Sequence, residues 1–245
     1  MGDAAAVVKY IESRLAQGAD SDRAEKERAY LKSELVFLGV GVPAARQVVR
    51  HAWGQRGGLD HEQLMAAVDR LWESGIHEHR MAVVELLKLA APGTLGIDDG
   101  PGLEHLLRTA RTWAYVDSLA ADVVGSLVVS EPKAWRPVLD RWASERDFWM
   151  RRSALLSLLV PLRQGGGDFE RFARYADAML DEREFFIRKA IGWVLRETGR
   201  QRPDLVAGWI EPRVARASGV TVREAVKHLD PERRAGIMAA YAAAR

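Results

Sequence analysis

The sequence predicts an all-α protein, a solenoid of stacked helical repeats. Three observations support this prediction. Apolar residues recur with the period of amphipathic helices along most of the chain, no segment shows the two-residue alternation of a β-strand, and one motif returns about every 36 residues. A pair of helices of about 36 residues buries its apolar faces only against neighbouring pairs, so a stack is the expected arrangement.

The helical period is clear in segments such as residues 83–90, where Val83, Leu86, Leu87 and Ala90 lie at i, i+3, i+4 and i+7. Breaks rich in glycine and proline separate the helical segments, at residues 39–43, 54–58, 92–101, 165–167 and 199–203. We therefore expect about twelve to fourteen helices joined by short loops. They form a single repeat domain over residues 1–245, with a helical N-terminal cap over about residues 1–40.

The repeat is carried by an aromatic residue followed by basic and small residues. Residues 148–153 (FWMRRS) return 37 positions later as residues 185–190 (FFIRKA). The small residues of this register, 35 to 37 positions apart, are Ala82, Ser118, Ser153, Ala190 and Ala225. The spacing is typical of HEAT-like repeats, which form a curved solenoid with a concave face that suits a long ligand.

One position of the repeat is basic in four of five copies. It is occupied by Arg80, Arg151, Arg188 and Arg223. A single arginine of this kind commonly bonds a helix end or a neighbouring turn, but four equivalent ones line up along one edge, where they suit phosphate. The copy around Ser118 departs from the pattern, with Val116 at this position and Asp117 after it. A carboxylate among basic repeats is a candidate for function.

Composition narrows the classes of function. The chain has 36 Lys and Arg against 34 Asp and Glu, and no Cys, which excludes disulfides, thiolate metal sites and a cysteine nucleophile. Charge-free stretches reach about half the length of a membrane-spanning helix, so we expect a cytoplasmic protein with no membrane partner. Net charge rises from −3 over residues 1–110 to +4 over residues 181–245. A polyanion is therefore expected to bind to the C-terminal two-thirds of the chain.

Metal and cofactor sites are not expected. The sequence has no phosphate-binding glycine loop, no nucleophile elbow and no dinucleotide fingerprint. Residues 77–79 (HEH) place two histidines two positions apart, on different faces of a helix, with no third ligand spaced for zinc. The protein is therefore expected to work without a cofactor.

Four segments carry a resemblance to a known family. Trp113 and Asp117 are four residues apart and share a helix face, and Trp193 lies one turn beyond Lys189. This pair, the double arginine of residues 151–152 and the string FFIRKAIGWVLRE of residues 185–197 resemble the AlkD-like DNA alkylation-repair glycosylases. Those are HEAT-like proteins that excise alkylated purines. The resemblance extends from about residue 37 to residue 228.

The resemblance implies a role for each matching residue. The catalytic carboxylate falls on Asp117, and the aromatic pair that flanks the lesion nucleotide falls on Trp113 and Trp193. The phosphate-binding arginine falls on Arg152, and the other basic residues of the repeats, expected to contact DNA, are Arg151, Arg188, Lys189, Arg223 and Lys227. Leu38 stands where the family often has a further aromatic before a glycine.

The chemistry fits these residues. An N3- or N7-alkylated purine is cationic and leaves as a neutral base, so no general acid is needed. Positive charge then develops on the deoxyribose, and a carboxylate near C1′ stabilises it. We therefore expect a monomeric, monofunctional DNA glycosylase of base excision repair, acting on duplex DNA that contains lesions such as 7-methylguanine or 3-methyladenine. The resemblance implies in addition that the lesion is captured without a base-flipping pocket.

Two other interpretations stay open. One is a self-resistance glycosylase that removes bulky natural-product adducts, for which Leu38 in place of an aromatic would widen the cleft. The other is a non-catalytic HEAT-like scaffold that binds DNA or protein. Asp117 argues against the scaffold, because a phosphate-binding surface has no use for a carboxylate.

Overall fold

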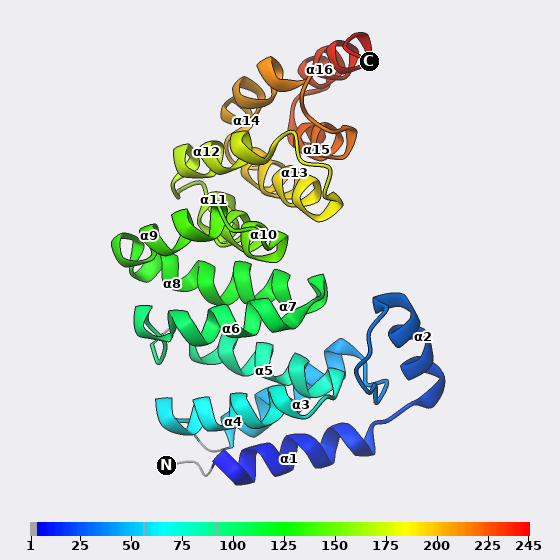
Figure 1. Cartoon of the computed structure of the whole chain (residues 1–245), viewed down its shortest axis with the longest axis vertical. Helices are drawn as coiled ribbons and strands as arrows, with labels where there is room; N and C mark the ends of the chain where they lie inside the picture. Colours follow the sequence, from blue (N-terminus) through cyan, green and yellow to red (C-terminus); the bar gives the residue numbers. More distant parts are fainter. Residues whose placement is uncertain (1–3, 56, 92) are drawn as a thin grey trace. The chain divides into compact units, whose positions relative to one another are not determined.

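The structure is a computed structural model that describes residues 4–55, 57–91 and 93–245. Over these residues the chain is helical, and its one β feature is an isolated parallel bridge between Val36 and Ile76 (Figure 1). With α7 and α8 counted as one helix, and α10 and α11 as another, the described residues hold fourteen helices. The all-α fold and the predicted number of helices are confirmed.

The chain divides into two compact units, Met1–Asp99 with Thr112–Leu119 and Gly100–Arg111 with Ala120–Arg245. The helices of the first unit are α1 (Ala4–Gln17), α2 (Ser21–Leu31), α3 (Val42–Gly54), α4 (His61–Glu73), α5 (His77–Ala90) and α7 (Trp113–Ser118). The predicted N-terminal cap is helical in α1 and α2, and residues 1–3 lie outside the described residues. That the chain forms one domain stays a prediction.

The first unit is a pack of neighbouring helices. Helix α1 contacts α3 and α4, and α5 contacts α3, α4 and α7. Its core consists of aliphatic side chains at helical spacing, among them Ile11, Leu15, Leu64, Leu71 and Leu86, which are fully buried. Because α7 rests on α5, the position of α7 depends on the helix before it in this unit.

Helix α2 differs from its neighbours, since none of its residues is buried. Figure 1 shows it beside the other helices of the first unit rather than among them. It is attached at its start, where the Asp20 N–H donates to the Leu38 carbonyl at 2.8 Å. Gly39 makes this contact possible: it has φ +82°, and a Cβ there would lie 2.0 Å from the Asp20 carbonyl oxygen.

The second unit contains the later repeats. Its helices are α6 (Gly100–Ala110), α8 (Gly125–Ser130), α9 (Pro132–Ala143), α10 (Phe148–Leu156), α11 (Leu159–Arg163), α12 (Phe169–Met179), α13 (Phe185–Gly199), α14 (Pro203–Ile210), α15 (Gly219–Ala225) and α16 (Pro231–Ala243). Helix α10 packs on α9 and α13, and α13 packs on α14 and α15. The helix pairs α9–α10, α12–α13 and α14–α15 are the predicted repeats.

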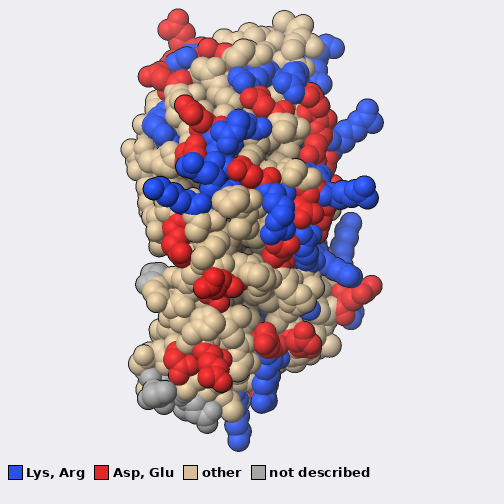
Figure 2. Space-filling model, turned by 60° about the vertical axis from the view of Figure 1, so that its left-hand side comes forward, with Lys and Arg blue, Asp and Glu red and all other residues tan. Residues whose placement is uncertain are grey.

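Ion pairs join successive repeats of the second unit. Glu104 accepts from Arg141 at 2.6 Å and from the Trp142 indole at 3.0 Å, and Asp177 accepts from Arg213 at 2.5 Å, in each case from a residue 36 to 38 positions later. Figure 2 shows the result on one face, where basic and acidic side chains are interleaved over this unit. Much of the C-terminal positive charge is therefore paired within the protein.

The run Trp113–Ser130 is the one described helix long and apolar enough to cross a membrane, with a mean hydropathy of 1.2 over 18 residues. Half of it is buried inside the protein, and core helices of soluble proteins pass the same test. Residues Leu119–Val124 of this run form a π-helix directly after α7. Such π-turns occur frequently at functional sites.

Candidate functional site

Trp113 and Asp117 share one face of α7. The helix begins after Thr112, whose side chain accepts from the Ala114 N–H at 3.4 Å. Trp113 is 37% exposed and Asp117 is half-buried, whereas Tyr115 and Val116 between them are buried. At 3.6 residues per turn, the tryptophan and the carboxylate point within about 40° of each other around the helix axis. The predicted pairing of these residues is therefore present in the first unit.

Tyr30 lies beside Trp113 and was not found from the sequence. It is at the end of α2 and is 73% exposed, and its ring stands edge-on to the Trp113 ring, with centroids 6.2 Å apart and planes at 85°. Leu38, which stands where the family often has a further aromatic, is half-buried, and its backbone N–H donates to Glu78. The only signal for Tyr30 in the sequence is an aromatic residue in an otherwise polar helix.

Trp193 lies on α13 in the second unit, half-buried, with cationic side chains one turn to either side. Lys189 precedes it by four residues and Arg196 follows it by three. Both cations donate to Glu224 of α15, at 2.9 Å and 2.5 Å. Lys227 donates to the same carboxylate at 3.0 Å. The predicted DNA-binding lysines are thus brought together around one carboxylate.

Glu224 remains ionised at this cluster. Burial would raise the pKa of its carboxyl group, but the hydrogen bonds from Lys189 and Lys227 outweigh burial and lower the pKa to about 2. Arg196 also pairs with Glu197, which in turn pairs with Arg200 and Arg163. The linked cations therefore outnumber the two carboxylates. The cluster is therefore electropositive beside Trp193, as a phosphate contact requires.

Three of the four equivalent arginines donate to backbone carbonyls, at the end of the preceding helix for Arg80 and in the loop after it for Arg151 and Arg188. Arg80 donates to the Trp72 carbonyl at 3.1 Å, and Arg188 donates to the Glu182 carbonyl at 2.7 Å. Arg151 donates to the carbonyls of residues 145 and 146 at 2.6 and 2.8 Å, and also pairs with Glu182. These are bonds to a helix end and to neighbouring turns, the first of the two interpretations of this position. A phosphate-binding role for Arg151 and Arg188 stays a prediction.

Arg223 behaves differently from these three. Among the described residues, its guanidinium makes no hydrogen bond to a carbonyl of this kind. It is exposed and lies beside Gly219. Counted from its N-cap Ser218, it is the fifth helical residue, the position that Asp117 holds after Thr112. Arg152 and Lys189 hold this fifth position in the repeats between. The register therefore places Arg223 with these residues rather than with Arg188.

Arg152 is buried, with 2% of its surface exposed. Its guanidinium donates to the Phe186 carbonyl and lies 5.7 Å from the centroid of the Phe186 ring. Phe148, Trp149 and Phe185 surround this ring, and Phe185 is 55% exposed. The predicted phosphate-binding residue thus supports an aromatic cluster, and its contact with phosphate stays a prediction.

The residues of the HEH segment are engaged within the protein. His77 Nδ1 is hydrogen-bonded to the Tyr115 hydroxyl, Glu78 binds backbone N–H groups, and His79 Nδ1 lies 3.0 Å from the Ser74 hydroxyl. Among the residues that the structure describes, no group of three or more His, Asp or Glu is arranged to hold a metal ion.

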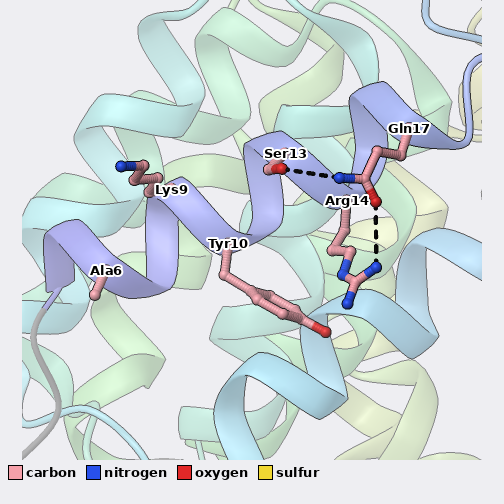
Figure 3. A pocket seen from close by; sticks show the side chains of 6 residues that line it. All are labelled: Ala6, Lys9, Tyr10, Ser13, Arg14 and Gln17. Atoms are coloured by element: carbon pink, nitrogen blue, oxygen red, sulfur yellow. Dashed lines mark hydrogen bonds between the residues drawn. The ribbon is translucent and has the colours of Figure 1, made fainter.

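A surface hollow of about 490 Å³ lies on α1, and none of the residues predicted to function lines it (Figure 3). Its lining residues are Ala6, Lys9, Tyr10, Ser13, Arg14 and Gln17. Gln17 bridges Ser13 and Arg14 by hydrogen bonds of 3.2 Å each. No carboxylate lines this hollow, so it offers no group that would stabilise a developing cation.

Comparison with known proteins agrees with the helical fold. A predicted DNA alkylation repair enzyme from Enterococcus faecalis has a similar structure, with a TM-score of 0.77 and 21% sequence identity over 87% of this chain and 97% of that one. AlkD2 from Streptococcus mutans gives a TM-score of 0.59 at 17% identity, over 84% of this chain and 99% of that one. Comparison with the curated proteins gives no significant match.

The sequence profile that describes DNA alkylation repair enzymes matches residues 11–229, which include every predicted site residue. The chain belongs to the DNA alkylation repair enzyme family.

Proposed function

We propose that the protein is a monofunctional DNA glycosylase that hydrolyses the N-glycosidic bond of cationic N3- or N7-alkylated purines in duplex DNA. The observation that carries the proposal is the face of α7, where an exposed tryptophan, Trp113, lies one helical turn from the carboxylate of Asp117. That the substrate is alkylated DNA is inferred from membership of the repair family. The aromatic surface and the carboxylate supply the two interactions that the reaction needs.

In the proposed reaction the bond between C1′ and the purine nitrogen breaks, and its electron pair leaves with the base. The cationic base departs neutral, and the positive charge moves to the deoxyribose. Asp117 stabilises this charge and orients a water that adds to C1′, whose proton passes to the carboxylate or to solvent. The faces of Trp113 and Trp193 attract the cationic base or sugar, with about 0.5–2 kcal/mol each.

We assign phosphate binding chiefly to the second unit, at Lys189, Lys227 and Arg223. The two lysines meet at Glu224 in a cluster with excess positive charge, and Arg223 is exposed. A lysine that donates to a carboxylate is an ammonium, which lacks the lone pair of a nucleophile. The proposed enzyme therefore forms no Schiff base and does not cleave the DNA strand.

A base-release assay tests this proposal. The substrate is duplex DNA with a single N7-methylguanine, and free base is measured under single-turnover conditions. Asp117→Asn is expected to lower the rate constant by roughly 10²- to 10³-fold while DNA affinity changes little. Asp122→Asn, five residues along the same helical run, is the matched control and is expected to retain activity.

Three outcomes would overturn parts of the proposal. Wild-type protein that binds DNA but releases neither 7-methylguanine nor 3-methyladenine would reject the enzyme assignment and favour a DNA-binding scaffold. Release restricted to a bulky N7 adduct would keep the glycosylase and change its substrate. An Asp117→Asn variant as fast as the wild type would reject the role of this carboxylate.

A further inference from the structure

The start of α5 contacts α7 through a buried side-chain pair. The Tyr115 hydroxyl and His77 Nδ1 are hydrogen-bonded, and the two residues are 1% and 4% exposed. Burial raises the pKa of the Tyr115 hydroxyl and lowers the pKa of His77, so the phenol donates and a neutral imidazole accepts. The Tyr115 ring also meets the Trp72 ring edge-on, with centroids 5.7 Å apart.

The same turn of α5 holds the segment that follows α2. The His77 imidazole stacks on the Phe37 ring, with centroids 4.3 Å apart and planes at 12°. Glu78, which is 0% exposed, accepts from three consecutive backbone N–H groups, those of Leu38 at 2.9 Å, Gly39 at 2.6 Å and Val40 at 3.1 Å. Two adjacent residues of α5 thus fix both α7 and the chain that leads back to Tyr30.

The geometry of α7 determines what this pair does. Tyr115 lies two residues from Trp113 and two from Asp117, and therefore about 160–200° around the helix axis from both. The buried ring of Tyr115 consequently anchors the helix from the side opposite the face that carries the tryptophan and the carboxylate. Tyr115 and Val116 are the buried residues of α7, and of the two it is Tyr115 whose side chain is hydrogen-bonded to α5.

We propose that Tyr115 and His77 are positioning residues, which set the rotation of α7 and so the place of Asp117 and Trp113. Through Phe37 and Glu78, the same turn of α5 sets the approach of Tyr30 to Trp113. The functional consequence rests on the proposed glycosylase activity, whereas the placement of Trp113 does not. The HEH segment thereby acquires a structural role.

The test uses the full-length protein labelled with 5-fluorotryptophan, in which Trp113→Phe identifies the ¹⁹F resonance of Trp113. Tyr115→Phe removes one hydroxyl group and keeps the ring. We expect a shifted or broadened Trp113 resonance and a single-turnover rate constant lowered about tenfold or more, with the Kd for duplex DNA changed less than twofold. His77→Gln, which keeps an acceptor on a flexible chain, is expected to give the same resonance change and serves if Tyr115→Phe does not fold.

Tyr175→Phe is the matched control. This buried tyrosine of the second unit donates to Asp140 at 2.5 Å, so its loss removes a comparable hydrogen bond outside the α7 support. It is expected to leave the Trp113 resonance and the rate constant unchanged. Wild-type rate and resonance in Tyr115→Phe would overturn the positioning role while leaving the glycosylase intact. If wild-type protein releases no base, the proposed function fails, and the resonance alone decides whether Tyr115 places Trp113.

Discussion

The Tyr30 ring stands edge-on to the Trp113 ring, with centroids 6.2 Å apart, although the two residues are 83 positions apart in the chain. Trp113 is therefore not an isolated surface aromatic but half of a pair built from α2 and α7. Edge-to-face pairs contribute about 0.5–1.5 kcal/mol. An aromatic pair next to a carboxylate is a surface on which a cationic base or sugar is stabilised.

Tyr30→Ala is expected to lower the single-turnover rate constant divided by Kd roughly three- to tenfold, because Trp113 loses its neighbour. Tyr30→Phe, which keeps the ring, is expected to remain close to the wild type. Tyr10→Ala, in α1 of the same unit, is the control for a lost tyrosine elsewhere. Equal activity of Tyr30→Ala and wild type would show that the pair has no part in base release.

Trp193 and Trp149 are both half-buried tryptophans of the second unit, and they are predicted to differ in function. Trp193→Leu is expected to lower the rate of base release roughly 2- to 30-fold, because a cation–π contact is lost. The free energy of unfolding is expected to change little. Trp149→Leu removes a ring packed 4.9 Å from the Phe186 ring and is expected to lower the free energy of unfolding instead. Urea unfolding and base release are measured on both variants. A loss of stability in Trp193→Leu together with a loss of activity in Trp149→Leu would refute the assignment.

Arg188 and Lys189 are neighbours with different expected effects on DNA binding. Arg188→Ala removes the bond to the Glu182 carbonyl and is expected to lower the free energy of unfolding by about 1–2 kcal/mol, with no change in the salt dependence of binding. Lys189→Gln is expected to reduce the slope of log Kobs against log salt by about one. A smaller slope for Arg188→Ala, at unchanged stability, would assign phosphate binding to Arg188 after all.

The Glu224 cluster makes a prediction about acid stability. A carboxyl group with a folded-state pKa of about 2, below its unfolded value, stabilises the protein above the unfolded value and loses that contribution as the pH falls towards 2. Glu224→Gln is expected to be less stable than the wild type by about 2 kcal/mol at pH 7. The difference is expected to shrink between pH 4.5 and 2 in denaturant titrations. A difference that is constant over this range would exclude the ion pairs as its source.

The helices and the α7 pair followed from the sequence because they depend on local spacing. A four-residue separation places Trp113 and Asp117 on one face in any helix, and the 37-residue return of the FWMRRS motif predicts α10 and α13. Contacts between distant segments were not predictable. The pairing of Tyr30 with Trp113 depends on how Gly39 lets α2 approach, and the binding of Arg188 to a carbonyl depends on where the preceding helix ends.

The regional charge was also an incomplete guide. It placed excess positive charge on the C-terminal part, but Arg213 and Arg216 of that part pair with Asp177 and Asp181 of the preceding repeat. A count of charges contains no information on which of them are paired. The prediction of a basic surface therefore holds for the cluster at Glu224 and not for every arginine of the repeats.

Gly192 lies against this cluster without carrying any charge. A Cβ at this position would meet the Glu224 Cβ at 2.8 Å and the Thr221 Cα at 3.2 Å, so α13 and α15 pack closely only because the side chain is missing. A single methyl group here would push the carboxylate away from Lys189 and Arg196 and weaken the ion pairs that hold these two cations beside Trp193. A glycine of the helix thus controls the arrangement of charges around Trp193, and an uncharged substitution is expected to act there as a charge mutation does.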